Sequence, residues 1–158
     1  MAPLVIDKLD LLSKYVGREI ATSEWIQVSQ AQIQQFADAT GDHNWIHIDA
    51  ERARRESPYG TTIAHGFLTL SLLSQFISQS LRVQRGVRMT INYGLNRVRF
   101  PSPVRADSRI RSRITLQSVK NCGDCTEAVY SIVVEVADVE KPCCVAEWIL
   151  RYYPEFAP

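Results

Sequence analysis

The segment from Gly41 to Asp49 gathers carboxylate, imidazole and amide side chains of the types that carry out acid/base chemistry. Asp42 and His47 are five positions apart, so on a helix they would point about 140° away from each other. In a loop they can converge on one small object. A carboxylate and an imidazole that hold one water molecule form an acid/base pair, because histidine titrates near neutral pH. A structural interpretation also stands, in which Asp42 caps a turn and His43 and His47 lie on the surface.

A second chemical feature is the sequence from Ala64 to Phe67, at the expected start of an apolar helix. The first N–H groups of a helix lack intrahelical partners and carry partial positive charge. Gly66 has no side chain to block them, which suits a carbonyl oxygen that becomes negative during reaction. The glycine also fits tight helix–sheet packing, and we expect His65 to be structural. Ser74, about two turns along, could donate into the same pocket or bond a carbonyl one turn back.

The elements that must position these residues are helices. Ser29 is a suitable N-cap for a helix over residues 30–40, which Gly41 would end. Residues 42–48 are expected to be non-helical, and Asp49 could cap a short helix over 50–56. A longer helix is predicted from about 64 to 81, apolar around most of its girth and so buried on most sides. Its main stripe is Phe67, Leu70, Leu73, Ile77 and Leu81.

The second half of the chain has the pattern of strands. β-branched and aromatic residues concentrate at 87–93, 98–100, 109–119, 126–136 and 145–153, after an earlier extended segment at 20–28. Residues 121–124 form a predicted hairpin turn. Consecutive hairpins imply an antiparallel sheet, so the sequence predicts an α+β architecture in which the sheet wraps the helix of residues 64–81. We expect one domain over residues 1–158.

Composition excludes several classes of function. The 158 residues carry a formal net charge of +1, which gives no field to attract nucleic acid or an anionic membrane. Residues 57–81 lack charged side chains, but their many Ser, Thr and Gln residues make them too polar for a membrane span. Asp7, Lys8 and Asp10 stand where a signal peptide needs an apolar run. We therefore expect a cytoplasmic protein.

The four cysteines raise the question of a metal site. Cys122 and Cys125 have C-x-x-C spacing at a turn, and Cys143 with Cys144 might complete a zinc site. Adjacent strand residues point to opposite faces, so those two can hardly both be ligands. We expect reduced core or surface thiols and no metal.

Residues 36–49, followed by 64–66, resemble the hydratase 2 motif of MaoC-like dehydratases. That group includes (R)-specific enoyl-CoA hydratases and nodulation protein N-like members. Residues 92–104 are also similar to the group. In all, the resemblance extends from about residue 23 to residue 152. The Gly-Asp-x-Asn-x-x-His core followed by Ala-His-Gly is specific as a combination. One departure is Trp45, where many members have proline; Trp45 must fix the loop by packing or line the pocket.

The resemblance implies a hotdog fold, an antiparallel sheet wrapped around a long central α-helix, and a homodimer with sheets paired edge to edge. It implies a hydro-lyase of fatty acid metabolism that adds water reversibly to a trans-2-enoyl thioester, giving the (R)-3-hydroxyacyl thioester. The family's catalytic residues fall on Asp42 and His47, and its supporting asparagine on Asn44. The oxyanion glycine falls on Gly66, and the helix serine of some members on Ser74.

The expected mechanism follows from these roles. Asp42 and His47 hold one water. By our hypothesis Asp42 takes a proton from this water as the water oxygen attacks C3. A proton then returns to C2 on the same side. No cofactor or metal is expected, because the thioester polarises the double bond. The substrate is a CoA or acyl-carrier-protein thioester. Arg97, Arg99 and Arg105 could meet CoA phosphates or simply be solvated.

Two alternatives come from other classes of function. A hotdog acyl-CoA thioesterase often uses a lone carboxylate, so the Asp42/His47 pair disfavours it. A non-catalytic acyl-binding partner subunit is disfavoured by the presence together of Asp42, Asn44, His47 and Gly66.

Overall fold

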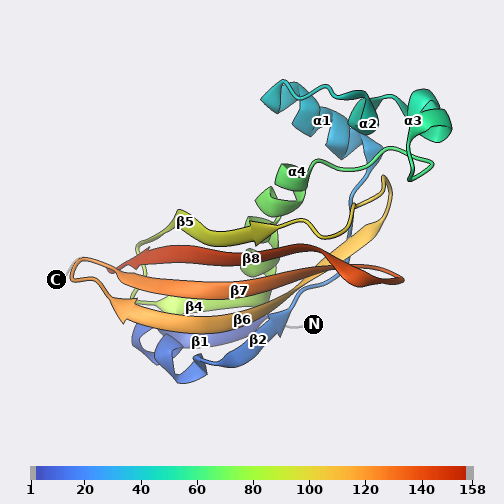
Figure 1. The fold of residues 1–158 in the computed structure, drawn as a ribbon. Coiled ribbons are helices and arrows are strands. Elements are labelled where there is room, and N and C mark those ends of the chain that lie inside the picture. The colour runs from blue at the N-terminus through green and yellow to red at the C-terminus, as the bar shows by residue number, and fades with distance from the viewer. Residues whose placement is uncertain (1–2, 156–158) are drawn as a thin grey trace.

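The computed structural model describes residues 3–155. Its main sheet has the strand order β2 (Arg18–Thr22), β6 (Arg109–Asn121), β7 (Thr126–Val136), β8 (Val139–Tyr153) and β5 (Met89–Arg99), as Figure 1 shows. Every pairing is antiparallel, and the short β3 (Ile26–Gln27) also pairs with β6. The alternating burial along β6 and β7 leaves one face of the sheet in the core.

The central helix lies on that buried face. It comprises α4 (Gly66–Ser71) and α5 (Leu73–Ser80), with Leu72 between them, and so confirms the helix predicted over 64–81 to within two residues at its ends. Leu68, Leu72 and Phe76 are buried against the sheet. Phe67 was expected in the buried stripe, but its exposed fraction is 69%. The sheet covers one side of the helix and leaves this residue uncovered. The structure is therefore α+β, with the sheet around a central helix.

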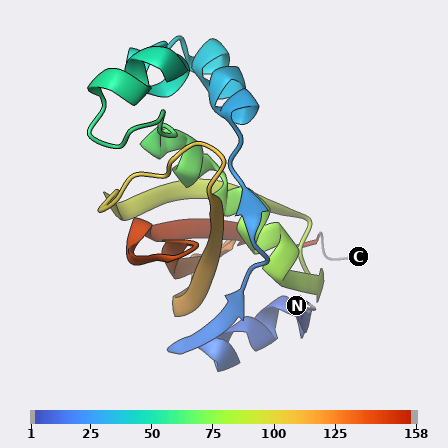
Figure 2. The ribbon, with the colours of Figure 1, turned by 90° about the vertical axis from the view of Figure 1, so that its right-hand side faces the viewer.

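Three short helices carry the chemical segment and lie together beyond the β5 edge of the sheet (Figures 1 and 2). We call this group, residues 30–56, the overhang: it contains α1 (Gln30–Thr40), α2 (Trp45–Ile48) and α3 (Ala50–Glu56). The Ser29 hydroxyl accepts from Gln32 N–H, and Gly41 ends α1 with φ 75°, as predicted. The expectation that 42–48 is non-helical was wrong for Trp45–Ile48, because the Asn44 side chain caps a single turn there.

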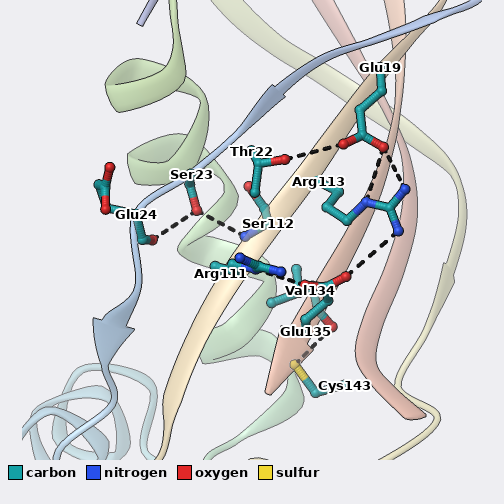
Figure 3. Close-up of polar contacts among 10 residues, drawn as sticks. All are labelled: Glu19, Thr22, Ser23, Glu24, Arg111, Ser112, Arg113, Val134, Glu135 and Cys143. Carbon is teal, nitrogen blue, oxygen red and sulfur yellow. Dashed lines mark hydrogen bonds and ion pairs between the residues drawn. The ribbon is translucent and has the colours of Figure 1, made fainter. Parts of the chain in front are cut away.

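Ser23 anchors the chain to β6 between β2 and β3, before the chain reaches the overhang (Figure 3). Its hydroxyl donates to Glu24 C=O at 3.0 Å and accepts from Ser112 N–H at 2.9 Å. The predicted extended segment at 20–28 is therefore two strands, β2 and β3, joined by this anchor. In the same view Arg113 lies between Glu19 and Glu135, with contacts of 2.6 and 3.7 Å. These ion pairs tie β2 to β6 and β7.

Other strand predictions need correction. The segments 87–93 and 98–100 form one strand, β5, because two register irregularities absorb its bends without ending its pairing to β8. A two-stranded parallel sheet of β1 (Leu4–Lys8) and β4 (Leu81–Arg85), with the 3-10 helix η1 (Leu9–Tyr15), was not predicted. Its register depends on contacts about 77 residues apart in sequence, beyond the reach of local patterns.

The cysteines are thiols, and three of them are buried. All four cysteines are free, and Cys125, Cys143 and Cys144 are buried. Burial raises the pKa of Cys143 to about 12 and that of Cys144 to about 11, so both are thiols at neutral pH. In residues 3–155 no helix combines the length and apolar character needed to cross a membrane.

Candidate active site

His47 is held by a hydrogen bond from its ring and another to its carbonyl, and both are supported by neighbouring residues. Its Nδ1 is 2.6 Å from Ile63 C=O, and a carbonyl only accepts, so Nδ1 carries the proton. Gln30 donates to the His47 carbonyl at 2.8 Å, and the Thr62 hydroxyl donates to the Gln30 side chain. Asn44 Oδ1 accepts from Ile46 N–H at 3.4 Å and caps the turn. The other imidazole nitrogen, Nε2, therefore bears a lone pair. The side chain of His47 is only 8% exposed, so the interpretation of His47 as a surface residue was wrong.

Asp42 follows the left-handed end of α1 and turns back toward His47. Its side chain is 56% exposed, and Oδ1 accepts from Asn44 N–H at 3.4 Å. Its carbonyl accepts from His65 Nε2 at 2.9 Å. Polar atoms of Asp42, His47 and His65 lie within 4.8 Å of one another. The loop thus brings the two predicted acid/base residues together, while His43 is exposed and bonds Asp38 at 2.9 Å.

The electrostatics of the site favour a neutral imidazole on His47. Burial lowers its pKa, and nearby His65 lowers it further. The Ile63 carbonyl and Asp42 act in the opposite direction and are outweighed. The pKa of the exposed His43 shifts in the opposite direction, because its hydrogen bond to Asp38 raises that pKa.

A cavity of about 300 Å³ adjoins His47 and Gly66, and we call it the catalytic cavity. Gly66 is the first residue of α4, so its N–H has no acceptor within the helix. A Cβ on Gly66 would lie 3.0 Å from the Phe100 ring, which leaves little space there for any side chain. The remaining lining residues are Tyr59, Ile63, Ala64, Thr69, Phe100, Pro101, Ser102, Pro103, Val104 and Cys143.

Ser74 lies apart from these groups. It lines a second cavity of about 280 Å³, here named the distal cavity, with Phe67, Leu70, Leu95 and Trp148. The Phe67 and Phe100 rings, one lining each cavity, meet edge to face with centroids 6.2 Å apart. The structure therefore does not place the Ser74 hydroxyl in the pocket of His47 and Gly66.

Two further predicted residues can now be placed. Trp45 packs outside the site, with the Arg52 guanidinium 4.4 Å from its ring centroid; of the two roles expected for it, packing is the one seen. Arg105 pairs through its backbone with Ile63 and lines a third cavity of about 520 Å³. That cavity shares Tyr59, Ser102 and Pro103 with the catalytic cavity. Arg97 and Arg99 lie on β5.

The close grouping of Asp42, His47 and His65 invites comparison with a metal site. Hydrogen bonds already engage His47 Nδ1 and His65 Nε2, and His65 Nδ1 is buried. That leaves His47 Nε2 and the Asp42 carboxylate, whereas catalytic zinc sites use three protein ligands. The donors fit an acid/base pair better than a metal.

Sequence reasoning missed the supporting residues Gln30, Thr62 and Ile63. Gln30 and Thr62 are separated by 32 positions and Ile63 acts through its carbonyl, so no local pattern identifies them.

An antiparallel sheet around a helix, a cavity lined by a histidine and by the first residue of that helix, and a carboxylate beside the histidine together define a hotdog-fold hydro-lyase. A family model described as the MaoC like domain matches residues 12–138, and the chain belongs to that family of MaoC-like dehydratases. It is a hydratase/dehydratase, as the sequence predicted.

Individual similarities agree with this family. The chain is 49% identical over 142 residues to 3-hydroxyacyl-thioester dehydratase Z of Mycobacterium tuberculosis, covering 89% of this chain and 93% of the relative. It is 46% identical over 139 residues to nodulation protein N of Rhizobium meliloti, covering 87% and 86%. The unliganded R-hydratase PhaJ1 of Pseudomonas aeruginosa has the same fold, with TM-score 0.71 and 24% identity over 89% of this chain and 83% of that one.

Proposed function

We propose that this protein adds water reversibly to trans-2-enoyl-CoA and gives (R)-3-hydroxyacyl-CoA, with Asp42 and His47 as the catalytic pair. The observation that carries the proposal is the shared cavity: it is lined by His47, whose Nε2 is unprotonated, and by Gly66, whose N–H has no acceptor within α4. Water activation and carbonyl polarisation are the two requirements of this reaction.

The catalytic roles follow from the protons already assigned. One water O–H donates to His47 Nε2 and the other to the Asp42 carboxylate. Asp42 takes its proton as the water oxygen bonds to C3, and negative charge moves onto the thioester oxygen, where Gly66 N–H donates to it. Asp42 then returns the same proton to C2. The sum is addition of one water, with no proton drawn from elsewhere, and the polarised thioester makes a metal or cofactor unnecessary.

The decisive assay follows the enoyl-thioester absorbance of crotonyl-CoA. We expect wild-type protein to remove it and to form the (R)-3-hydroxy product, identified by chiral chromatography. Asp42→Asn and His47→Asn should each lose about 100-fold or more of the rate. Asparagine at 47 keeps a donor for the Ile63 carbonyl while it removes the Nε2 base. Full activity in both variants would refute the assigned pair.

The same reaction mixture tests the alternatives. Free thiol released from the acyl-CoA would indicate a thioesterase. A protein inactive on crotonyl-CoA and on longer enoyl-CoA, which copurifies with an unlike chain in native mass spectrometry, would be a partner subunit.

The proposed active form is a homodimer built on the free edge of β5. Exposed apolar side chains stand at alternate positions of this edge strand: Met89, Ile91, Tyr93 and Leu95. Phe67, on the uncovered side of the central helix, and Tyr93 both line the distal cavity beside this strand. A second copy would cover these side chains and pair the open edge.

We also propose a cytoplasmic role in fatty acid metabolism. Acyl thioesters are the substrate class of the proposed reaction, and the cytosol keeps free cysteines such as these four reduced.

A further inference from the structure

His65 connects the separate parts of the site but has no role in the proposed reaction. Its ring is 3% exposed and stacks on His47, with centroids 3.7 Å apart and planes at 27°. The Phe36 ring lies 5.0 Å away in a tilted arrangement. His65 is also the residue immediately before Gly66, where it stands at the N-cap of α4. His65 thus contacts His47 and Phe36 and immediately precedes the first residue of the central helix.

The hydrogen bonds of His65 define its protons. Nε2 lies 2.9 Å from the Asp42 carbonyl, which can only accept, so Nε2 donates. Nδ1 is buried and has no hydrogen-bond partner within the described residues. The proton that the carbonyl bond requires is therefore on Nε2.

That bond determines where the Asp42 carboxylate lies. Asp42 is in a short loop, and its side chain is 56% exposed, with Oδ2 3.8 Å from His65 Nε2. The exposed carboxylate cannot be fixed by packing. The bond to its backbone carbonyl from a buried, rigid imidazole supplies that restraint.

The stack on His47 has an electrostatic effect as well. The charged or titratable groups around His47 are Asp42 and His65, with Tyr59 and the neutral Cys143 thiol lining the cavity. Asp42 favours protonation of His47 and His65 opposes it. The stacked His65 ring excludes water from one face of His47, and burial is the chief cause of the lowered pKa of His47. The ring therefore helps to preserve the Nε2 lone pair that the water needs.

We infer that His65 is a positioning residue: it holds Asp42 through the carbonyl bond and keeps His47 as a free base through the stack. The inference rests on the proposed function and extends it to a residue that touches no reacting atom. A structural role alone would require His65 for folding but not for the geometry or protonation of the pair.

The test compares His65→Gln with His65→Leu, and uses Phe36→Leu as a matched control for the loss of a ring contact. Glutamine places its Nε2 at the same number of bonds from the backbone as histidine Nε2, so it keeps the donor and removes the ring. We expect His65→Leu to lower kcat about 100-fold with KM within about 2-fold, since the substrate contacts remain. His65→Gln should recover most of kcat, and Phe36→Leu should resemble wild type.

The two functions of His65 separate in the pH dependence. In His65→Gln the acidic limb of kcat/KM should move to higher pH, because the ring that excludes water from one face of His47 is gone. Titration of the His47 imidazole by ¹H–¹⁵N NMR should show the same shift without any turnover. Equal losses of activity and of Tm in both His65 variants, with no shift of the His47 titration, would overturn the inference. An inactive wild type whose His47 shift is still present would count against the proposed function alone.

Discussion

The acid/base pair is built from two side chains with opposite surroundings. His47 is buried and fixed by the Ile63 carbonyl, whereas the Asp42 carboxylate is more than half exposed. Each environment suits its role, because the imidazole must stay neutral to hold water and the carboxylate must stay charged to take a proton.

Stability should therefore depend on the protonation of His47. Its pKa is lowered in the folded state, chiefly by burial, so below about pH 6.5 the unfolded state binds more protons and stability falls as the pH falls. We expect the Tm of wild type to drop more than that of His47→Asn between pH 7 and pH 5. The comparison removes the contribution of His43, whose pKa is raised and whose effect has the opposite sign. Parallel Tm curves for the two proteins would contradict the prediction.

Gly66→Ala tests the space beside the oxyanion donor. The added methyl group would approach the Phe100 ring at 3.0 to 3.1 Å, and the ring, 41% exposed, can yield by turning into the catalytic cavity. We expect kcat/KM to fall about 10-fold while Tm changes by only a few degrees, since alanine favours the helix. Adding Phe100→Leu should restore part of the rate. A variant with wild-type kinetics would show that the space is not used by substrate.

At the scale of elements, the sequence predicts those whose ends are set locally. Ser29 and Gly41 define α1, and the alternation in Arg109–Val119 defines most of β6. The turn that carries His47 has a local cap, Asn44, but it escaped prediction because its tether, Gln30, lies 17 positions away in α1. For the site, the sequence predicted one pocket for Asp42, His47, Gly66 and Ser74, whereas Ser74 lies apart from the other three. Only the packing of Phe67 against Phe100 shows that the cavities are divided.

The division between the two cavities predicts a preference for chain length. The Phe67 and Phe100 rings are in contact, and one lines the distal cavity and the other the catalytic cavity. We therefore expect a short acyl chain to fit the catalytic cavity and a longer one to have to pass the rings. Phe100→Ala should raise the ratio of kcat/KM for 2-octenoyl-CoA over crotonyl-CoA about 10-fold. The crotonyl-CoA rate of the same variant serves as the internal control. An unchanged ratio would mean that long chains follow another path.

At the scale of the whole molecule, the exposed β5 edge predicts the assembly. Introducing charge with Ile91→Lys and Leu95→Lys should convert a dimer, of twice the 17.9 kDa chain mass, into a monomer by light scattering. Val139→Lys is a matched control, because Val139 is exposed to a similar degree, 46%, on the hairpin between β7 and β8. A wild type that is monomeric at micromolar concentration would refute the proposed homodimer.

The anchor at Ser23 has a consequence for how the molecule moves. The overhang carries Asp42 and His47, while Gly66 belongs to the helix inside the sheet. A bound thioester would touch both and act as a temporary cross-link between them. Amide protons of α1 and α2 should then exchange with solvent more slowly when product is bound, so the site would be most rigid during the chemical step and loosest when empty.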